Sequence, residues 1–284
     1  MLIFYFSLKI KDKTIFLKTG GFKTNMLGAI AGDVIGAPYE FNNIDKSGYQ
    51  SFALFRNDSS FTDDTVLTVA TAHWILNKGD LAKKYKRYYN DYPGRGYGNR
   101  FSIWADSRSF KPYNSFGNGS AMRVSPVSLA YNNIDDVLFY AKASAEVTHN
   151  HPEGIKGAQA AAAAGFFARS GKGKGYIKRY IEKKFEYNLD EPIESISKWY
   201  GFDVSCQGTV PQAIRVFLES ENFEDAIRKA MYIGGDSDTI ACIAGGIAEN
   251  FFGGTPQAIK EKLFKILDPR LVGTIEKFYK KYHL

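Results

Sequence analysis

Two acidic segments, far apart in the chain, each precede a strongly apolar helical stretch, and this pair constrains the fold more than any other feature. Segment 62–64 reads Thr-Asp-Asp ahead of apolar residues at helical spacing, and segment 236–239 reads Asp-Ser-Asp-Thr ahead of a second such stretch. An aspartate at the N-terminus of a helix is favourable through capping and the helix dipole. Either segment alone is therefore explained equally well as a well-capped helix.

Taken together, the two segments place four carboxylates and two hydroxyls at the ends of helices that must be buried. Their negative charges repel unless a cation neutralises them. Oxygen ligands suit Mg²⁺, Mn²⁺ or Ca²⁺, whereas zinc favours His and Cys. Two such ions would orient substrate hydroxyls and lower the pKa of a bound water toward about 7. The predicted metal ligands are Thr62, Asp63, Asp64, Asp236, Asp238 and Thr239.

Helical periodicity continues through the chain after Met26, and strand alternation is hard to find there. Thr62 is the expected N-cap of a helix that ends near Gly79. Further helices are expected from 135 or 136 to 146, at 153–168, at 211–219 with Pro211 in the first turn, at 222–230 with Asn222 as N-cap, and at 255–267. The predicted fold is all-α, a compact orthogonal multi-helix bundle with a two-metal cleft.

Residues 1–25 differ in character from the rest, because the stretches 2–6 and 14–17 resemble short strands around a charged turn. We interpret them as an N-terminal extension, or as the result of an upstream start codon, ahead of a domain spanning 26–284. The alternative is an added β-hairpin packed on that domain.

The net charge of +7 does not indicate nucleic acid, because residues 1–25 carry five lysines against one acid and the remaining chain is only slightly basic. The basic run 172–184 favours a solvated surface. Cys206 and Cys242 belong to no metal or redox motif and are expected to be buried thiols in a reducing compartment. No apolar run approaches the roughly 18 residues that span a bilayer. We therefore expect a cytoplasmic protein.

Two segments rich in glycine and aromatic residues, 92–98 and 112–120, have no helical period and are expected to be binding loops. Glu40 follows Pro38 and lies between aromatic residues, and sequence alone favours a surface acid over a ligand. Asp33 is expected to serve only to cap or tie down a glycine-rich turn.

Five blocks in this order resemble the ADP-ribosylglycohydrolase family: 28–33 through Glu40, 62–65, 117–123, Thr148-His149 and 234–241. The resemblance runs from Met26 to about Gly254. It implies an all-α hydrolase that removes ADP-ribose from a mono-ADP-ribosylated target by cleaving the N- or O-glycosidic bond at C1″. It also implies two divalent cations, Mg²⁺ or Mn²⁺.

The resemblance further implies roles for single residues. It places Glu40 at the metal site. Glu40, Asp63 and Asp64 are then the catalytic candidates, one of which would accept a proton from the attacking water. His149 matches a ligand-contacting histidine, whereas His151 does not. The loops at 92–98 and around Trp104 depart from the family and are expected to line the cleft. The implied substrate-binding residues are Gly117, Asn118, Gly119, Ser120, Met122 and His149.

Two other functions stay open. A two-metal phosphohydrolase acting on a nucleotide is one, although none of the four histidines is followed by Asp, as in many such enzymes. A non-catalytic ADP-ribose-binding protein is the other, and the complete set of ligand-type residues argues against it. The expected partner is an ADP-ribosylated protein or small molecule, with the acceptor linkage and the oligomeric state open.

Overall fold

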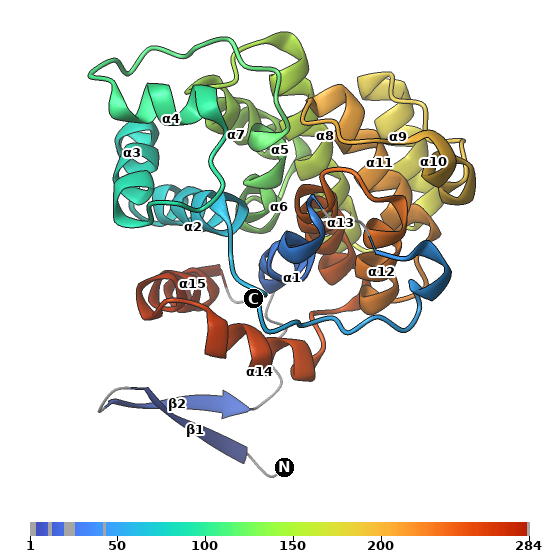
Figure 1. The fold of residues 1–284 in the computed structure, drawn as a ribbon. Helices are drawn as coiled ribbons and strands as arrows, with labels where there is room; N and C mark the ends of the chain where they lie inside the picture. The colour runs from blue at the N-terminus through green and yellow to red at the C-terminus, as the bar shows by residue number, and fades with distance from the viewer. Residues whose placement is uncertain (1–3, 11–12, 20–25, 42–43, 283–284) are drawn as a thin grey trace.

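The computed structural model describes residues 4–10, 13–19, 26–41 and 44–282 (Figure 1). Helices form nearly all of its regular structure beyond Met26, which confirms the all-α prediction. The helices are α1 (Leu27–Gly36), α2 (Asp63–Asn77), α3 (Leu81–Asp91), α4 (Asn99–Asp106), α5 (Gly119–Met122), α6 (Ser125–Ala130), α7 (Ile134–Glu146), α8 (Pro152–Arg169), α9 (Lys174–Phe185), α10 (Ile193–Trp199), α11 (Cys206–Glu219), α12 (Phe223–Ile233), α13 (Ser237–Phe252), α14 (Gln257–Ile266) and α15 (Pro269–Tyr282), with the 3₁₀ turns η1 (Ala37–Tyr39) and η2 (Lys46–Gly48).

Helix α13 forms the centre of the fold, and its residues are buried from Ser237 to Glu249. Helices α1, α8, α11 and α12 pack against it (Figure 1). A helix that is apolar all round is buried on every side, so the sequence of α13 requires this central place.

Helix α1 packs against α13 through small residues. Gly28, Gly32 and Gly36 recur at intervals of four and therefore share one side of α1. A Cβ on Gly32 would lie 2.0 Å from the carbonyl oxygen of Ala241, and one on Gly36 would lie 2.5 Å from Cα of Asp238. The absence of these side chains lets the two backbones touch, which fixes the end of α1 beside the start of α13.

Asp33, in the middle of α1, attaches α2 to this pair. Its buried carboxylate accepts hydrogen bonds from the backbone N–H and hydroxyl groups of both Thr62 and Thr65. These donors lie at the first turn of α2, where helix N–H groups lack partners within the helix. Asp33 therefore does more than tie down a turn, because it anchors the N-terminus of α2 to α1.

Most predicted helices are confirmed to within three residues at each end, and Thr62 and Asn222 are N-caps as expected. The prediction for Pro211 is wrong, because α11 begins at Cys206 and Pro211 lies inside it. Ser205 caps this helix by accepting from Gly208 N, which starts it a full turn earlier. Helix α7 likewise begins one residue early, with Asn133 as its N-cap.

Strands β1 (Phe4–Ile10) and β2 (Lys13–Thr19) pair antiparallel, with Phe4 opposite Thr19 and Ile10 opposite Lys13. Figure 1 shows this hairpin beyond α14, at the edge of the helical body. Within the described ranges these two strands form the one sheet. Residues 1–3, 11–12 and 20–25 of the expected extension lie outside the described residues.

Both cysteines are buried and free, as predicted. In the part of the chain that the structure describes, no helix is both long and apolar enough to cross a membrane.

The start of α1 is held by the C-terminal part of α13. The backbone N–H of Met26 donates to the buried Glu249 carboxylate at 2.6 Å, and the hydroxyl of Thr255 donates to its other oxygen at 2.7 Å. Burial raises the pKa of Glu249 to about 7. This hydrogen bond ties residue 26 to the helical body.

We propose that residues 26–284 fold without the preceding segment. A chain that begins at Met26 should unfold, in a thermal melt followed by circular dichroism, at a midpoint no lower than that of the full chain, because its terminal ammonium group would face Glu249. A clearly lower midpoint would show that residues 1–25 contribute to the stability of the domain.

The contact between α1 and α13 can be tested with a single methyl group. Gly32→Ala should lower the free energy of unfolding by about 3 kcal/mol or more, because the new Cβ would overlap backbone atoms that cannot move independently. Gly273→Ala in α15 is the matched control: nothing lies within 4 Å of its Cβ, so it should be neutral or stabilise by about 1 kcal/mol. Urea titration measures both, and equal effects would contradict the close-packing argument.

Candidate functional site

One cleft brings the two acidic segments together at the N-termini of α2 and α13. The six predicted metal ligands and Glu40 all line it. Thr239 Oγ1 donates across the junction to Asp64 Oδ2 at 3.4 Å, which links α13 to α2 directly. The expectation that these segments meet in space is therefore met.

Three of the cleft carboxylates converge. One oxygen each from Glu40, Asp236 and Asp238 lie within 4.8 Å of one another. Asp64 Oδ1 is buried with no hydrogen-bond partner among the described residues. The nearby thiol of Cys242 donates instead to the Met122 carbonyl oxygen at 3.3 Å. A buried carboxylate oxygen without a donor is costly, so it needs a proton or a cation.

Burial and mutual repulsion disfavour the ionised forms of Glu40 and of three aspartates in this cluster, Asp63, Asp64 and Asp238. Burial raises the pKa of Asp63 well above its usual range, and the charges of Asp33 and Asp236 add to the effect. The pKa values of Asp64 and Asp238 are raised in the same way, first by burial and then by neighbouring aspartates. Glu40, at the mouth of the cluster, has its pKa raised to about 7 by burial and by the charges of Asp236 and Asp33.

This donor set fits hard divalent cations. It consists of carboxylate and hydroxyl oxygens, and one buried oxygen of Asp64 has no hydrogen-bond partner among the described residues. Six or more oxygen ligands suit Mg²⁺, Mn²⁺ or Ca²⁺. The group of converging ligand atoms consists of oxygens from Glu40, Asp236 and Asp238 and includes no histidine or cysteine.

Part of the cleft lining comes from the segment between Tyr113 and Arg123 and from His149. Asn118, Gly119, Met122 and His149 line the cleft, as the resemblance implied. The side-chain amide of Asn118 donates to Asp236 Oδ2 at 2.7 Å, so this residue also orients a carboxylate.

Gly117 and Ser120, also implied to bind substrate, are not part of the cleft lining. The Ser120 hydroxyl is fully buried and donates to the Gly154 carbonyl oxygen at 2.7 Å, because the first turn of α5 directs it away from the cleft. Gly117 pairs instead with Ser205 in an isolated β-bridge.

The loop 92–98 closes the acidic end of the cleft through its backbone. The carbonyl oxygen of Arg95 accepts from Asp63 N at 2.7 Å, and Gly96 and Gly98 line the cleft, as expected of this loop. The expectation for Trp104 is wrong, because this residue lies buried in α4 and donates to the Lys111 carbonyl oxygen. Phe101, on the same helix, lines the cleft in its place.

Comparison with known proteins decides the family. Residues 22–282 match the family model described as ADP-ribosylglycohydrolase. The chain belongs to this family. The match confirms the resemblance seen in the sequence and the enzyme class, a glycosidic-bond hydrolase.

Individual proteins similar to this ADP-ribosylglycohydrolase have names that fit the same family. It is 26% identical over 312 residues to ADP-ribosylhydrolase ARH3 of Gallus gallus, covering 82% of this chain and 85% of the relative. It is 24% identical over 252 residues to ADP-ribosyl-(dinitrogen reductase) glycohydrolase of Rhodospirillum rubrum, covering 80% and 84%. A solved structure described as an ADP-ribosylglycohydrolase-related protein complex superposes with a TM-score of 0.70 at 23% identity, covering 91% of this chain and 96% of that chain, which supports the fold.

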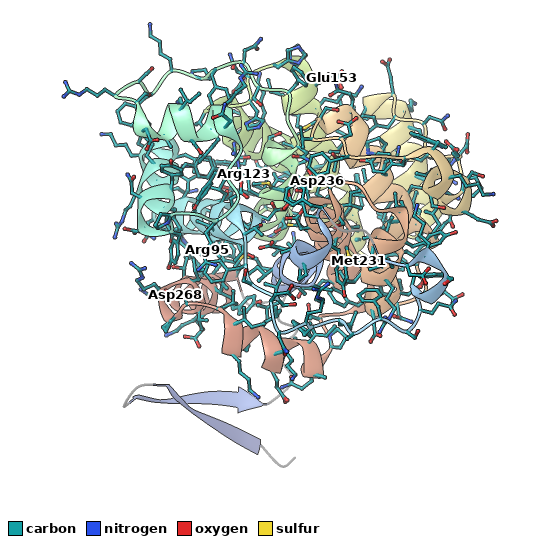
Figure 2. The ribbon with its side chains drawn as sticks, in the orientation of Figure 1. Arg95, Arg123, Glu153, Met231, Asp236 and Asp268 are labelled. Atoms are coloured by element: carbon teal, nitrogen blue, oxygen red, sulfur yellow. The ribbon has the colours of Figure 1, made fainter. Side chains whose placement is uncertain are left out.

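Several cleft residues of this family member were not predicted. Arg123 lies in the block 117–123, which the resemblance implies to be the loop for the diphosphate and ribose, but it is not among the residues predicted singly to bind substrate; the structure buries it completely against the cleft. Figure 2 shows Arg123 and Asp236 near the middle of the helical body, and both line the same cleft. The other unpredicted lining residues are Leu67, Phe101 and Val204, whereas Gly96, Gly98 and Tyr113 fall in the two loops expected to bind.

The raised pKa values give a signed prediction for stability. A group whose pKa is higher in the folded state stabilises the fold most at low pH. For Glu40 that contribution is lost as the pH rises from 4.5 to about 7. The same rule applies to Asp238, whose pKa is also raised. Without metal, Asp238→Asn should therefore raise the free energy of unfolding at pH 8 by at least about 1 kcal/mol, since one pKa unit corresponds to roughly that much. The amide oxygen can still accept from Thr239 N.

Chemical denaturation in EDTA buffer measures this effect, with the exposed Asp58→Asn as control, which should change stability by less than about 0.5 kcal/mol. Adding Mg²⁺ or Mn²⁺ should stabilise the wild-type chain more than Asp238→Asn. A destabilised Asp238→Asn chain in EDTA would contradict a repulsive cluster.

Proposed function

We propose that this chain is a metal-dependent ADP-ribosylhydrolase that releases ADP-ribose from a mono-ADP-ribosylated target by cleaving the glycosidic bond at C1″. One observation carries the proposal: a single cleft is lined both by converging carboxylates and by the cationic side chain of Arg123. Glu40, Asp236 and Asp238 converge, and Arg123 and His149 line the same cleft. A substrate with a ribose diol at one end and a diphosphate further along is complementary to both.

Two divalent cations would be held by Thr62, Asp63, Asp64, Asp236, Asp238 and Thr239. When bound, they supply charge for orienting the ribose hydroxyls and for activating water. The unpartnered oxygen of Asp64 and the converging oxygens of Asp236 and Asp238 support this assignment.

The residues of the chain would then position the substrate and move a proton. Glu40 is half-buried at the mouth of the cluster, and its pKa of about 7 suits it to accept a proton near neutral pH. Asp63 and Asp64 lie in the first turn of α2. Their role would therefore be to hold the substrate and the cations in place. Fixed geometry of this kind supplies much of the rate in enzymes.

The names of the relatives favour a protein target. One is a glycohydrolase named for ADP-ribosyl-dinitrogen reductase, and others are named ADP-ribosylhydrolases. We propose an ADP-ribosylated protein as substrate, or a small molecule bearing the same group. The loop 92–98, fixed against Asp63, is the wall at the acidic end and the place where the acceptor would be selected.

The rival functions predict different results. A nucleotide phosphohydrolase would leave a free phosphate, and a non-catalytic reader would bind ADP-ribose without turnover. Incubating the chain with proteins mono-ADP-ribosylated on arginine or on serine, with Mg²⁺ or Mn²⁺ and with EDTA, separates these outcomes when ADP-ribose and phosphate are both quantified. Release of ADP-ribose only with metal supports the proposal, and phosphate release or no product contradicts it.

Asp63→Ala should lower the rate of ADP-ribose release by at least about a hundredfold while the melting transition persists, because a predicted ligand and no core side chain is lost. Asp203→Ala, a carboxylate outside the cleft lining, is a control for charge removal and should retain activity to within a few-fold. An Asp63→Ala chain as active as wild type in EDTA would exclude the metal-dependent mechanism.

A further inference from the structure

The hydrogen-bond role of one ring nitrogen of His149 is fixed by its neighbours. Nδ1 of His149 lies 2.7 Å from Thr148 Oγ1, and both side chains are buried. The same hydroxyl oxygen lies 2.7 Å from the Nη2 atom of Arg123. A guanidinium group has only donors, so Thr148 accepts from Arg123 and retains its own hydrogen to donate.

That hydrogen has one place to go. Among the described residues, Thr148 Oγ1 has no partner other than Arg123 and His149, and its burial keeps solvent away. A buried hydroxyl that donated nothing would cost about 1–3 kcal/mol. The hydroxyl therefore donates to Nδ1 of His149, and a neutral imidazole that accepts at Nδ1 carries its proton on Nε2.

The surroundings also keep the ring neutral. Burial, followed by the positive charges of Arg123 and Arg100, lowers the pKa of His149 well below its usual value. Within the described residues no carboxylate forms an ion pair with Arg123, whose guanidinium carbon lies 4.3 Å from the ring centroid of Tyr85. The positive charge of Arg123 is therefore not neutralised by an ion pair and acts on His149.

The other ring nitrogen, Nε2 of His149, lies beside Gly117 and Gly119. A Cβ on Gly119 would be 3.2 Å from Nε2 of His149, and one on Gly117 would be 3.6 Å away. His149 and Gly119 both line the cleft. The missing side chains leave the N–H open to a bound molecule.

We propose that Arg123 and Thr148 are positioning residues that hold His149 in the Nε2–H tautomer, so that the ring donates a hydrogen bond into the cleft. The partner must be an acceptor oxygen. On the proposed function, on which this last step rests, it is an oxygen of the diphosphate, which accepts charge-assisted hydrogen bonds.

The tautomer can be observed directly. Long-range ¹H–¹⁵N correlation spectra of ¹⁵N-histidine-labelled protein at pH 7.5 distinguish a protonated from an unprotonated ring nitrogen, and His149→Gln identifies the signals of His149. The wild-type chain and Thr148→Ser should show protonated Nε2 and bare Nδ1. Thr148→Val, which keeps the shape and removes the hydroxyl, should shift the population toward the other tautomer. A wild-type ring protonated on Nδ1, or a Thr148→Val spectrum identical to wild type, would overturn the proposal.

Binding of ADP-ribose, measured by calorimetry, tests the consequence. Thr148→Val should raise Kd about tenfold, which corresponds to about 1.4 kcal/mol, and Thr148→Ser should bind within about twofold of wild type. Melting curves establish that each variant is folded, and the wild-type spectrum decides the tautomer even if Thr148→Val does not fold. Failure of the wild-type chain to bind ADP-ribose overturns the diphosphate assignment and the proposed function, whereas the tautomer is judged on the spectra alone.

Discussion

The backbone contact between α1 and α13 is the constraint on which the site depends. It exists because Gly28, Gly32 and Gly36 have no side chains where the two helices meet. The contact fixes the C-terminal end of α1, followed by Glu40, beside the first turn of α13. Asp33 then uses the same helix to hold the first turn of α2 through both backbone and hydroxyl donors. One close approach thus sets the positions of both acidic segments.

The cost of this arrangement is electrostatic. Burial raises the pKa values of Asp63, Asp64 and Asp238, which means that the fold opposes their ionised form. The positive ends of α2 and α13 offset part of that cost, since both helices begin at these acids. The remaining imbalance supports the proposal that the cluster is a functional site, because a carboxylate group selected only for stability would be paired or exposed.

Local signals could be predicted from the sequence, whereas contacts between distant segments could not. Thr62 and Asn222 were recognisable as caps because capping involves only the next few residues. Pro211 misled because the start of its helix is set by Ser205, outside the pattern that surrounds the proline. Arg123 carries no sign in the sequence that a charged side chain will be buried beside a cleft, and that outcome depends on how α5 packs. The acidic segments could be paired because their shared chemistry and their resemblance to a family supplied what local pattern lacks.

The charged and hydrogen-bonding groups of the cleft also depend on both local and distant contacts. Its acidic end is built by helix termini that only the tertiary fold brings together. Arg123, Thr148 and His149 form a hydrogen-bonded group, of which the last two are neighbours in the chain. On the proposed tautomer, the neutral ring of His149 would require an acceptor, while the carboxylates and any cation they hold would favour hydroxyl oxygens. On the proposed function, a ligand that carries a diol and a diphosphate would therefore bind with its diol, and the bond next to it, at the acids.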